Sequence, residues 1–156
     1  MHAIDTNVHD EFLSFNLGAE QYAIDILRVR EIREHTPVTR IANSARAMLG
    51  IFDLRGAIVP VFDMRTMLGM SPAAPGGNPV VIILDIDGRP AGIVVDAVCQ
   101  VFALEAGAVK ALPRGTTHVD DACIRGAVSV GDEMLIVLDI ARLMGTLDEG
   151  AQAQAA

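Results

Sequence analysis

The chain has 156 residues, of which 51% are hydrophobic and 21% are charged, and its formal net charge is −8. This length suits about one domain with a buried core, and the composition excludes an intrinsically disordered chain. The acidic balance disfavours nucleic acid and anionic lipid surfaces as partners, because both are negatively charged.

Short apolar segments separated by turn residues run along most of the chain, which predicts an all-β fold. Strands are expected at 11–17, 22–26, 58–62, 80–86, 91–95 and 134–138. Asp87-Gly88 predicts a tight hairpin between two of them, because glycine tolerates the positive φ that such turns require. Pro60 has no backbone N–H, so its strand is expected at a sheet edge or at a bulge.

Helices are expected to be few and short. Asn43-Ser44 is a candidate cap for a turn over residues 45–49 that stops at Gly50. Residues 63–69 and 139–145 share one design, in which an aspartate starts a short helix and a glycine ends it.

The two halves of the sequence resemble each other, which predicts a duplicated β-unit. The matching segments are 59–69 with 135–145 at an offset of 76, 11–17 with 80–86 and 22–26 with 91–95 at an offset of 69, and 55–57 with 125–127 at an offset of 70. The Pro/Gly-rich stretch 71–79 is the expected linker. Two small closed sheets would bury the apolar faces and remove most sheet edges.

Motifs for catalysis, metals and cofactors are missing from the sequence. The histidines lack metal-ligand spacing; they are His2, His9, His35 and His118. Asp120-Asp121 is interpreted as a solvated loop, because adjacent side chains point apart. Asp63 and Asp139 are interpreted as helix caps in preference to catalytic carboxylates. We therefore expect no catalytic residue, no metal and no cofactor.

Two segments indicate binding. Residues 28–34 place five charges around Val29 and Ile32, and this pattern fits either a solvated outer strand or an interaction strand. Arg55 is a lone charge among apolar residues near Gly56, so it is expected to pair with a carboxylate or a carbonyl group.

The compartment is expected to be the cytoplasm. The N-terminal residues lack a basic region followed by an apolar core, and no apolar run approaches the ~20 residues of a membrane span. Cys99 and Cys123 are too few and too far apart for a disulfide framework. No direct membrane insertion is expected.

Residues 53–65 carry a specific motif: they match (N)LRG-x-[IV]-[IV]-P-[IV]-x-D-[LM]-R, the signature of the CheW family of bacterial chemotaxis coupling proteins. Further stretches agree with that family in the same order: 11–18, 22–32, 38–43, 92–96 and 131–136. The resemblance spans roughly residues 11 to 145, which makes it more specific than one motif.

This resemblance implies two five-stranded SH3-like β-barrels side by side, with a few short helices. The first barrel would cover about 11–70 and the second about 80–145, with exchange of strands between the halves left open. Residues 1–10 and 146–156 are expected to be flexible ends. It also implies a non-enzymatic adaptor, monomeric when isolated, that joins the regulatory domain of the histidine kinase CheA to the cytoplasmic hairpin tip of methyl-accepting chemoreceptors, in membrane-associated arrays.

The resemblance further implies where the partners bind. The receptor groove would involve Val29, Glu31, Gly50, Arg55, Gly56, Val94, Val95, Asp96 and Val98, with an Arg55–Glu31 ion pair. The kinase contact would come mainly from the second barrel, with a ring contact at Lys110, Pro113, Arg114 and Gly115. Two departures stand out: Asp53 replaces the usual Asn before the Leu-Arg-Gly motif, and Arg114-Gly115 replaces the acidic and aromatic residues that relatives often carry.

Two other functions remain open from the sequence. The same fold could serve another chemosensory pathway, such as surface motility or second-messenger control. A more remote alternative is a β-barrel that binds a small molecule, which would require a polar pocket with titrating groups.

Overall fold

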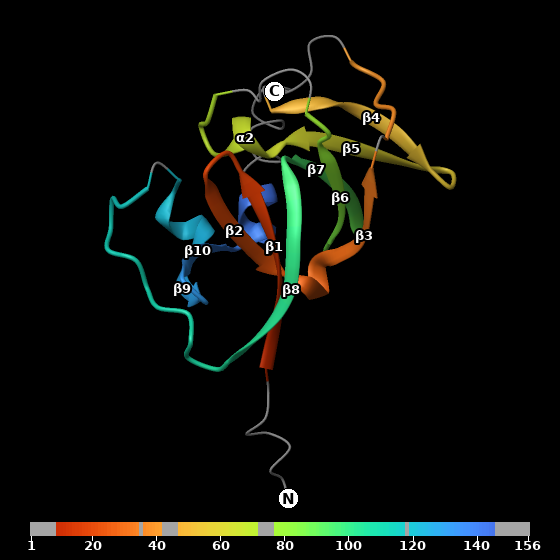
Figure 1. The fold of residues 1–156 in the computed structure, drawn as a ribbon. Helices are drawn as coiled ribbons and strands as arrows, with labels where there is room; N and C mark the ends of the chain where they lie inside the picture. Colours follow the sequence, from red (N-terminus) through yellow and green to blue (C-terminus); the bar gives the residue numbers. More distant parts are fainter. Residues whose placement is uncertain (1–8, 35, 42–46, 72–76, 118, 146–156) are drawn as a thin grey trace, which may run out of the picture.

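Two five-stranded sheets make up the computed structural model, which describes residues 9–34, 36–41, 47–71, 77–117 and 119–145 (Figure 1). The first sheet has the order β8-β1-β2-β10-β9, with β8 Ala97–Glu105, β1 His9–Leu17, β2 Glu20–Asp25, β10 Glu133–Leu138 and β9 Ile124–Val130. The second sheet has the order β3-β6-β7-β5-β4, with β3 Val29–Glu34, β6 Val80–Ile86, β7 Arg89–Val95, β5 Ala57–Asp63 and β4 Met48–Leu54. The predicted all-β fold is confirmed.

The strand order confirms the duplication. Strands β1 to β5 correspond to β6 to β10, and exchanging each strand for its counterpart converts one sheet order into the other. The offset of 69 holds for the two hairpins, since Leu17 pairs with Glu20 and Ile86 pairs with Arg89. The offset of 76 holds for the later strands, but the match of 55–57 to 125–127 is wrong, because the first is a turn and the second lies inside β9.

Each sheet combines strands from both halves of the sequence. The β1–β2 hairpin joins three strands of the second half, and the β6–β7 hairpin joins three strands of the first half. The ranges 11–70 and 80–145 therefore describe the halves of the sequence and not the two sheets. The predicted flexible ends and most of the predicted linker lie outside the described residues.

One large hydrophobic core lies between the sheets, and this shared core is larger than the core of either sheet alone. Strand β6 explains why: Ile82 and Leu84 face the shared core, while Val81 and Ile83 face the core of the second sheet. A strand that is buried on both faces must be apolar throughout, which accounts for the continuous run in this segment.

Within the described residues, neither sheet closes into a complete ladder. The segment after β3 meets β4 through a single bridge between Thr39 and Ile51, and Lys110 and Ala127 form the equivalent bridge in the first sheet. Each predicted barrel is therefore a curled sheet, and one bridge connects the two sides of its opening. Gly50 and Gly126 precede these bridges, and a Cβ on either would lie 2.2 Å from the carbonyl oxygen of Thr39 or Lys110.

Short helical turns lie between or after several strands, and aspartates cap them. The turns are η1 Ile26–Arg28, α2 Met64–Met67, η2 Asp121–Cys123 and a helix that begins at Ile140. The caps at Asp63 and Asp139 were predicted, whereas Asp25, which caps η1, and Asp120, which caps η2 in the stretch predicted as a solvated loop, were not. Asp63 accepts a hydrogen bond from the Arg65 N–H, and Asp139 accepts one from the Arg142 N–H. The predicted turn over 45–49 is wrong where the structure describes it, because β4 begins at Met48.

Tight turns and Pro60 follow local backbone rules. Asp87-Gly88 and Arg55-Gly56 both have positive φ at their two residues and close the hairpins β6–β7 and β4–β5. Pro60 lies in an inner strand and not at an edge, and the ladder of this strand with β4 has a register shift between Met48 and Gly50. Strand β7 pairs only with Val61–Asp63, so the missing N–H interrupts no ladder on that side. Among the helices of the described residues, none has the length and hydrophobicity needed to span a membrane.

Candidate functional site

The predicted ion pair between Arg55 and Glu31 is present. Arg55, in the β4–β5 turn, donates from Nη2 to Glu31 Oε2 at 2.6 Å, and Arg33 donates from Nη1 to Oε1 at 3.1 Å. Glu31 therefore lies between two guanidinium groups at the free edge of the second sheet. The hydrogen bond from Arg55 and the charges of both arginines hold the pKa of Glu31 below its usual range.

Local turn chemistry presents Arg55 at the tip of its hairpin. Both turn residues have positive φ, and the Gly56 N–H donates to Asp53 Oδ1 at 2.7 Å. Aspartate and asparagine can both accept this hydrogen bond, so the departure from the family signature at Asp53 preserves the turn. The Asp85 carboxylate accepts the equivalent bond from Gly88 in the β6–β7 hairpin.

Val29 and Val98 occupy equivalent positions on the two edge strands, β3 and β8. Each valine lies beside a register shift, and each is half-buried against the rim of the shared core. Strands β3 and β8 are the edge strands of their sheets, and both valines pack against the shared core between the sheets. The structure thus places Val29, Glu31, Arg55 and Gly56 on the second sheet and Val98 on the edge strand of the first.

Two residues of the predicted groove lie inside the protein, and a third is half-buried. Val95 is 1% exposed in the shared core, Gly50 is buried against Thr39, and Val94 is half-buried against the core of the second sheet. Val95 and Gly50 therefore belong to the packing beneath the predicted groove and not to its exposed lining.

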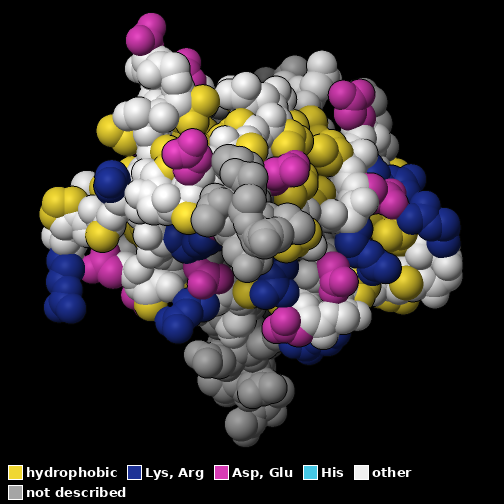
Figure 2. Space-filling view, turned by 90° about the horizontal axis from the view of Figure 1, so that it is seen from below, with side chains coloured by type: hydrophobic (Ala, Val, Ile, Leu, Met, Phe, Trp, Pro, Cys, Tyr) yellow, Lys and Arg dark blue, Asp and Glu magenta, His cyan; other side chains and the backbone are white. Residues whose placement is uncertain are grey.

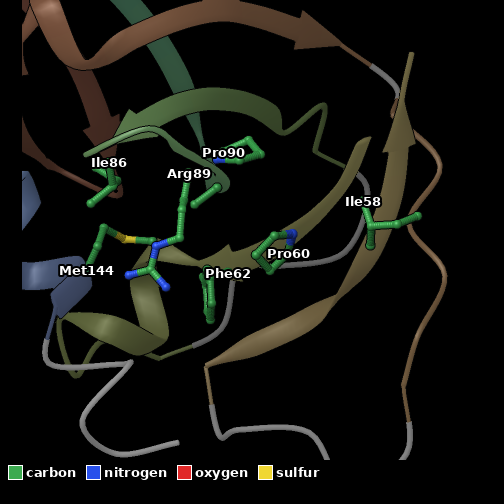
Figure 3. Close-up of a pocket in the computed structure, with 8 residues that line it drawn as sticks. Ile58, Pro60, Phe62, Ile86, Arg89, Pro90 and Met144 are labelled. Atoms are coloured by element: carbon green, nitrogen blue, oxygen red, sulfur yellow. The ribbon is translucent and has the colours of Figure 1, made fainter. Parts of the chain in front are cut away.

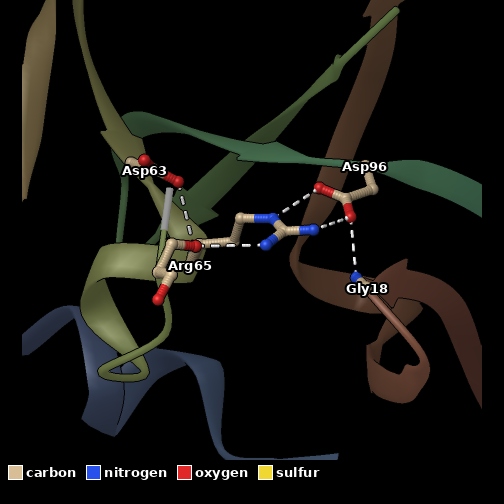
Figure 4. Close-up of polar contacts among 5 residues, drawn as sticks. Gly18, Asp63, Arg65 and Asp96 are labelled. Atoms are coloured by element: carbon tan, nitrogen blue, oxygen red, sulfur yellow. Dashed lines mark hydrogen bonds and ion pairs between the residues drawn. The ribbon is translucent and has the colours of Figure 1, made fainter. Parts of the chain in front are cut away.

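Asp96 is part of a polar cluster between the sheets (Figure 4). It accepts hydrogen bonds from Arg65 at Oδ1 (2.9 Å) and Oδ2 (2.5 Å), and Oδ2 also accepts the Gly18 N–H at 2.7 Å. These bonds hold the pKa of the Asp96 carboxyl below its usual range. Arg65 also donates from Nη1 to the Ser71 carbonyl oxygen at 3.1 Å.

The residues predicted for the kinase or ring contact lie in the exposed segment between β8 and β9. Lys110, Pro113, Arg114 and Gly115 are all exposed, and the Pro113 carbonyl oxygen accepts hydrogen bonds from Thr116. Lys110 borders an apolar hollow of about 420 Å³, which also contacts Leu104, Ala108, Ala111, Leu112, Ala127, Val128, Ser129 and Met134. The Met134 side chain is 63% exposed.

A second apolar hollow, of about 260 Å³, lies on the second sheet where it borders the shared core (Figure 3). Its lining comprises Ile58, Pro60, Phe62, Ile86, Arg89, Pro90, Ala91 and Met144. The equivalent face of the first sheet carries Met134 at the position of Ile58 and Glu20 at the position of Arg89, so the charge is reversed. On the face in Figure 2, positive and negative side chains are interspersed among hydrophobic ones.

Sequence reasoning missed the partners of Arg65 and the two hollows. The signature places Arg65 two residues after Asp63, but nothing in the spacing indicates Asp96 as its partner. The matching positions of Ile58 and Met134 in the repeat were a usable signal, since the offset of 76 relates two exposed apolar side chains. Among the described residues, no group of three or more His, Cys, Asp or Glu side chains could hold a metal ion.

These features define a two-sheet binding module with exchanged strands, one shared core and separate surfaces on each sheet. The profile of the CheW-like domain matches residues 11–148. The chemotaxis protein CheW of Klebsiella aerogenes is 40% identical over 139 residues, covering 89% of this chain and 84% of that protein. The probable chemotaxis protein CheW of Rhizobium etli is 29% identical, covering 90% and 91%.

A solved structure of a related protein has a similar fold. The scaffolding protein TtCheW from Thermoanaerobacter tengcongensis matches with a TM-score of 0.79 and 29% identity, covering 87% of this chain and 92% of that one. The chain belongs to the CheW-like domain family.

Proposed function

We propose that this protein is a non-enzymatic adaptor that couples chemoreceptors to the histidine kinase CheA in bacterial chemotaxis. It would work in the cytoplasm and be recruited to receptor arrays at the membrane. The observation that carries the proposal is the Arg55–Glu31 pair beside Val29 on a free sheet edge, in a chain whose relatives are named chemotaxis proteins. The cores of the two sheets are filled by side chains, which disfavours a barrel that binds a small molecule.

The receptor would bind between the edge strands. A receptor hairpin presents helices, and a helix needs an apolar strip bordered by polar groups that fix its register. Val29 and Val98 supply apolar contacts from the two sheets, and Glu31 and Arg55 supply charge at the border. An adaptor of this kind acts by favouring one arrangement of its partners, so signalling requires that the two binding regions be coupled through the shared core.

The kinase would bind the first sheet around the β8–β9 segment. Lys110 and the exposed Met134 border the same apolar hollow, which offers a hydrophobic anchor site beside a positive charge. Receptor and kinase would then contact different regions, so single substitutions should separate the two activities.

Substituting Arg55→Ala is expected to weaken binding of a soluble receptor hairpin about tenfold, because it removes the ion pair that orients Glu31. Binding to the CheA regulatory domain should not change. The melting temperature should shift by less than about 2 °C, since Arg55 is largely exposed. Isothermal titration at near-physiological salt measures both affinities.

Arg125→Ala is the matched control, because Arg125 forms an exposed ion pair with Asp10 on the other sheet. Unchanged hairpin affinity in Arg55→Ala would contradict the assignment of the receptor site. A folded wild-type protein that binds neither partner would contradict the adaptor function itself.

Substituting Arg114→Glu is expected to weaken binding of the kinase regulatory domain about three- to tenfold and to leave receptor binding intact, because the charge reversal lies beside the proposed anchor site. Arg40→Glu is the control, since Arg40 is exposed next to the equivalent bridge of the second sheet. Equal kinase affinities for both variants would show that the β8–β9 segment makes no kinase contact.

A further inference from the structure

Asp96 occupies the point at which the chain passes from the second sheet to the first. Strand β7 ends at Val95 and β8 begins at Ala97. The Asp96 N–H donates to the Asn16 carbonyl oxygen at 3.1 Å, and its carboxylate accepts the Gly18 N–H. Both of these contacts tie the crossover to the β1–β2 hairpin of the first sheet.

Arg65 connects the same crossover to the second sheet. It lies in α2, which directly follows β5, and β5 carries the Arg55 turn at its other end. Its guanidinium binds both oxygens of Asp96, a geometry that fixes direction as well as distance. Arg65 and Asp96 side chains are 16% and 28% exposed, whereas Arg55 is 72% exposed in its pair with Glu31.

The equivalent crossover, from β2 to β3, is built differently. It passes through η1, where Asp25 accepts a hydrogen bond from the Leu27 N–H within the same turn. Arg28 of η1 also forms an ion pair with Asp87 in the β6–β7 turn at 3.1 Å, but this pair is a single contact and the Asp87 side chain is 79% exposed. The crossover at Asp96 differs because its ion pair is made through two hydrogen bonds, is less exposed and connects α2 of the second sheet to the β1–β2 turn of the first. This asymmetry is not required by the repeat, and it occurs two residues before Val98.

We propose that Asp96 and Arg65 are positioning residues, which set the placement of β8 relative to β3 and thereby the affinity for the receptor helices, without touching them. The proposal rests on the adaptor function proposed above. It changes the role of Asp96 from a contact residue of the groove to a support behind it. Because the Asp96 side chain is held by Arg65 and Gly18 together, its loss would remove the link from the start of β8 to α2 of the second sheet, while the ladder between β8 and β1 remains.

The test is to measure strand placement and receptor binding in the same variants. Nitroxide labels at Arg30→Cys and Val101→Cys, both exposed on the edge strands, report the distance between β3 and β8 by pulsed electron paramagnetic resonance. Cys99 and Cys123 are first replaced by serine and alanine. Asp96→Asn is expected to broaden or shift the distance distribution and to weaken hairpin binding about three- to tenfold at pH 7.

Two further variants keep the test decisive. Arg65→Lys retains the charge but loses the two-point geometry, so it should fall between wild type and Asp96→Asn in both measurements, even if the latter folds poorly. Asp10→Asn makes the same chemical change at an exposed ion pair, and it should alter neither measurement.

An unchanged distance distribution in Asp96→Asn and Arg65→Lys would overturn the proposal, as would a changed distribution with unchanged hairpin affinity. A loss of affinity with an unchanged distance distribution would restore Asp96 to the direct contact surface. Should wild-type protein fail to bind the hairpin, the adaptor function fails, and the distance measurement still decides whether the cluster positions β8.

Discussion

Replacing Gly50 by alanine is expected to lower the free energy of unfolding by about 3 kcal/mol, because there is no space for a side chain. A Cβ would lie 2.2 Å from the Thr39 carbonyl oxygen. That oxygen accepts the Ile51 N–H at 2.9 Å, and the Thr39 N–H donates to the Ile51 carbonyl oxygen at 2.8 Å. Moving Thr39 away would strain both hydrogen bonds and disrupt the bridge between Thr39 and Ile51 of β4. Thermal unfolding should show a melting temperature about 6–12 °C lower.

Gly126→Ala is expected to have a similar effect, since a Cβ there meets the Lys110 carbonyl oxygen at the same 2.2 Å. Gly77→Ala is the neutral control, because it has open space around it and no positive φ. If Gly50→Ala and Gly77→Ala have the same melting temperature, the close approach of Gly50 to Thr39 does not limit which residue this position can hold. A receptor-binding defect in a Gly50 variant should accordingly be compared with its stability before it is assigned to the groove.

Elements whose conformation is determined by residues close to them in the sequence could be predicted. The Asp87-Gly88 hairpin and the Asp63 and Asp139 caps follow from backbone preferences within a few residues. The repeat offsets of 69 and 76 also hold, because they compare whole strand patterns. The offset of 70 failed because three residues, Arg-Gly-Ala, occur in a turn in one half and in a strand in the other.

Features that depend on strand exchange could not be predicted from spacing. Nothing local indicates that β8 pairs with β1, so the repeat indicated the two halves but left the exchange of strands between them open. Pro60 shows the same difficulty, because its tolerance depends on where the β5–β7 ladder begins. The Arg55–Glu31 pair came from the family resemblance, whereas the burial of Val95 and the Arg65–Asp96 contact depend on which strands lie together.

Substituting Phe15→Ala is expected to destabilise the protein by about 4 kcal/mol and to weaken both sheets together. Phe15 is fully buried in the shared core and stacks on Tyr22, with ring centroids 6.0 Å apart. Because this core also contains Ile82, Leu84 and Ile93 of the second sheet, a cavity at Phe15 removes contacts from both sides. Chemical denaturation should show one transition at lower denaturant, and hydrogen exchange should accelerate in strands of both sheets.

Phe52→Ala distinguishes a molecule whose two sheets unfold together from one whose sheets unfold independently. Phe52 is 7% exposed in the core of the second sheet, away from Tyr22, the only tyrosine in a chain without tryptophan. If the exchanged strands make one folding unit, this variant should also lower a single transition, and the near-ultraviolet signal of Tyr22 in the first sheet should be lost together with the backbone signal. A Tyr22 signal that survives while the second sheet unfolds would show that the shared core does not join the two sheets energetically. In that case receptor and kinase sites on different sheets could not be coupled through it, and coupling would have to pass through the crossover at Asp96.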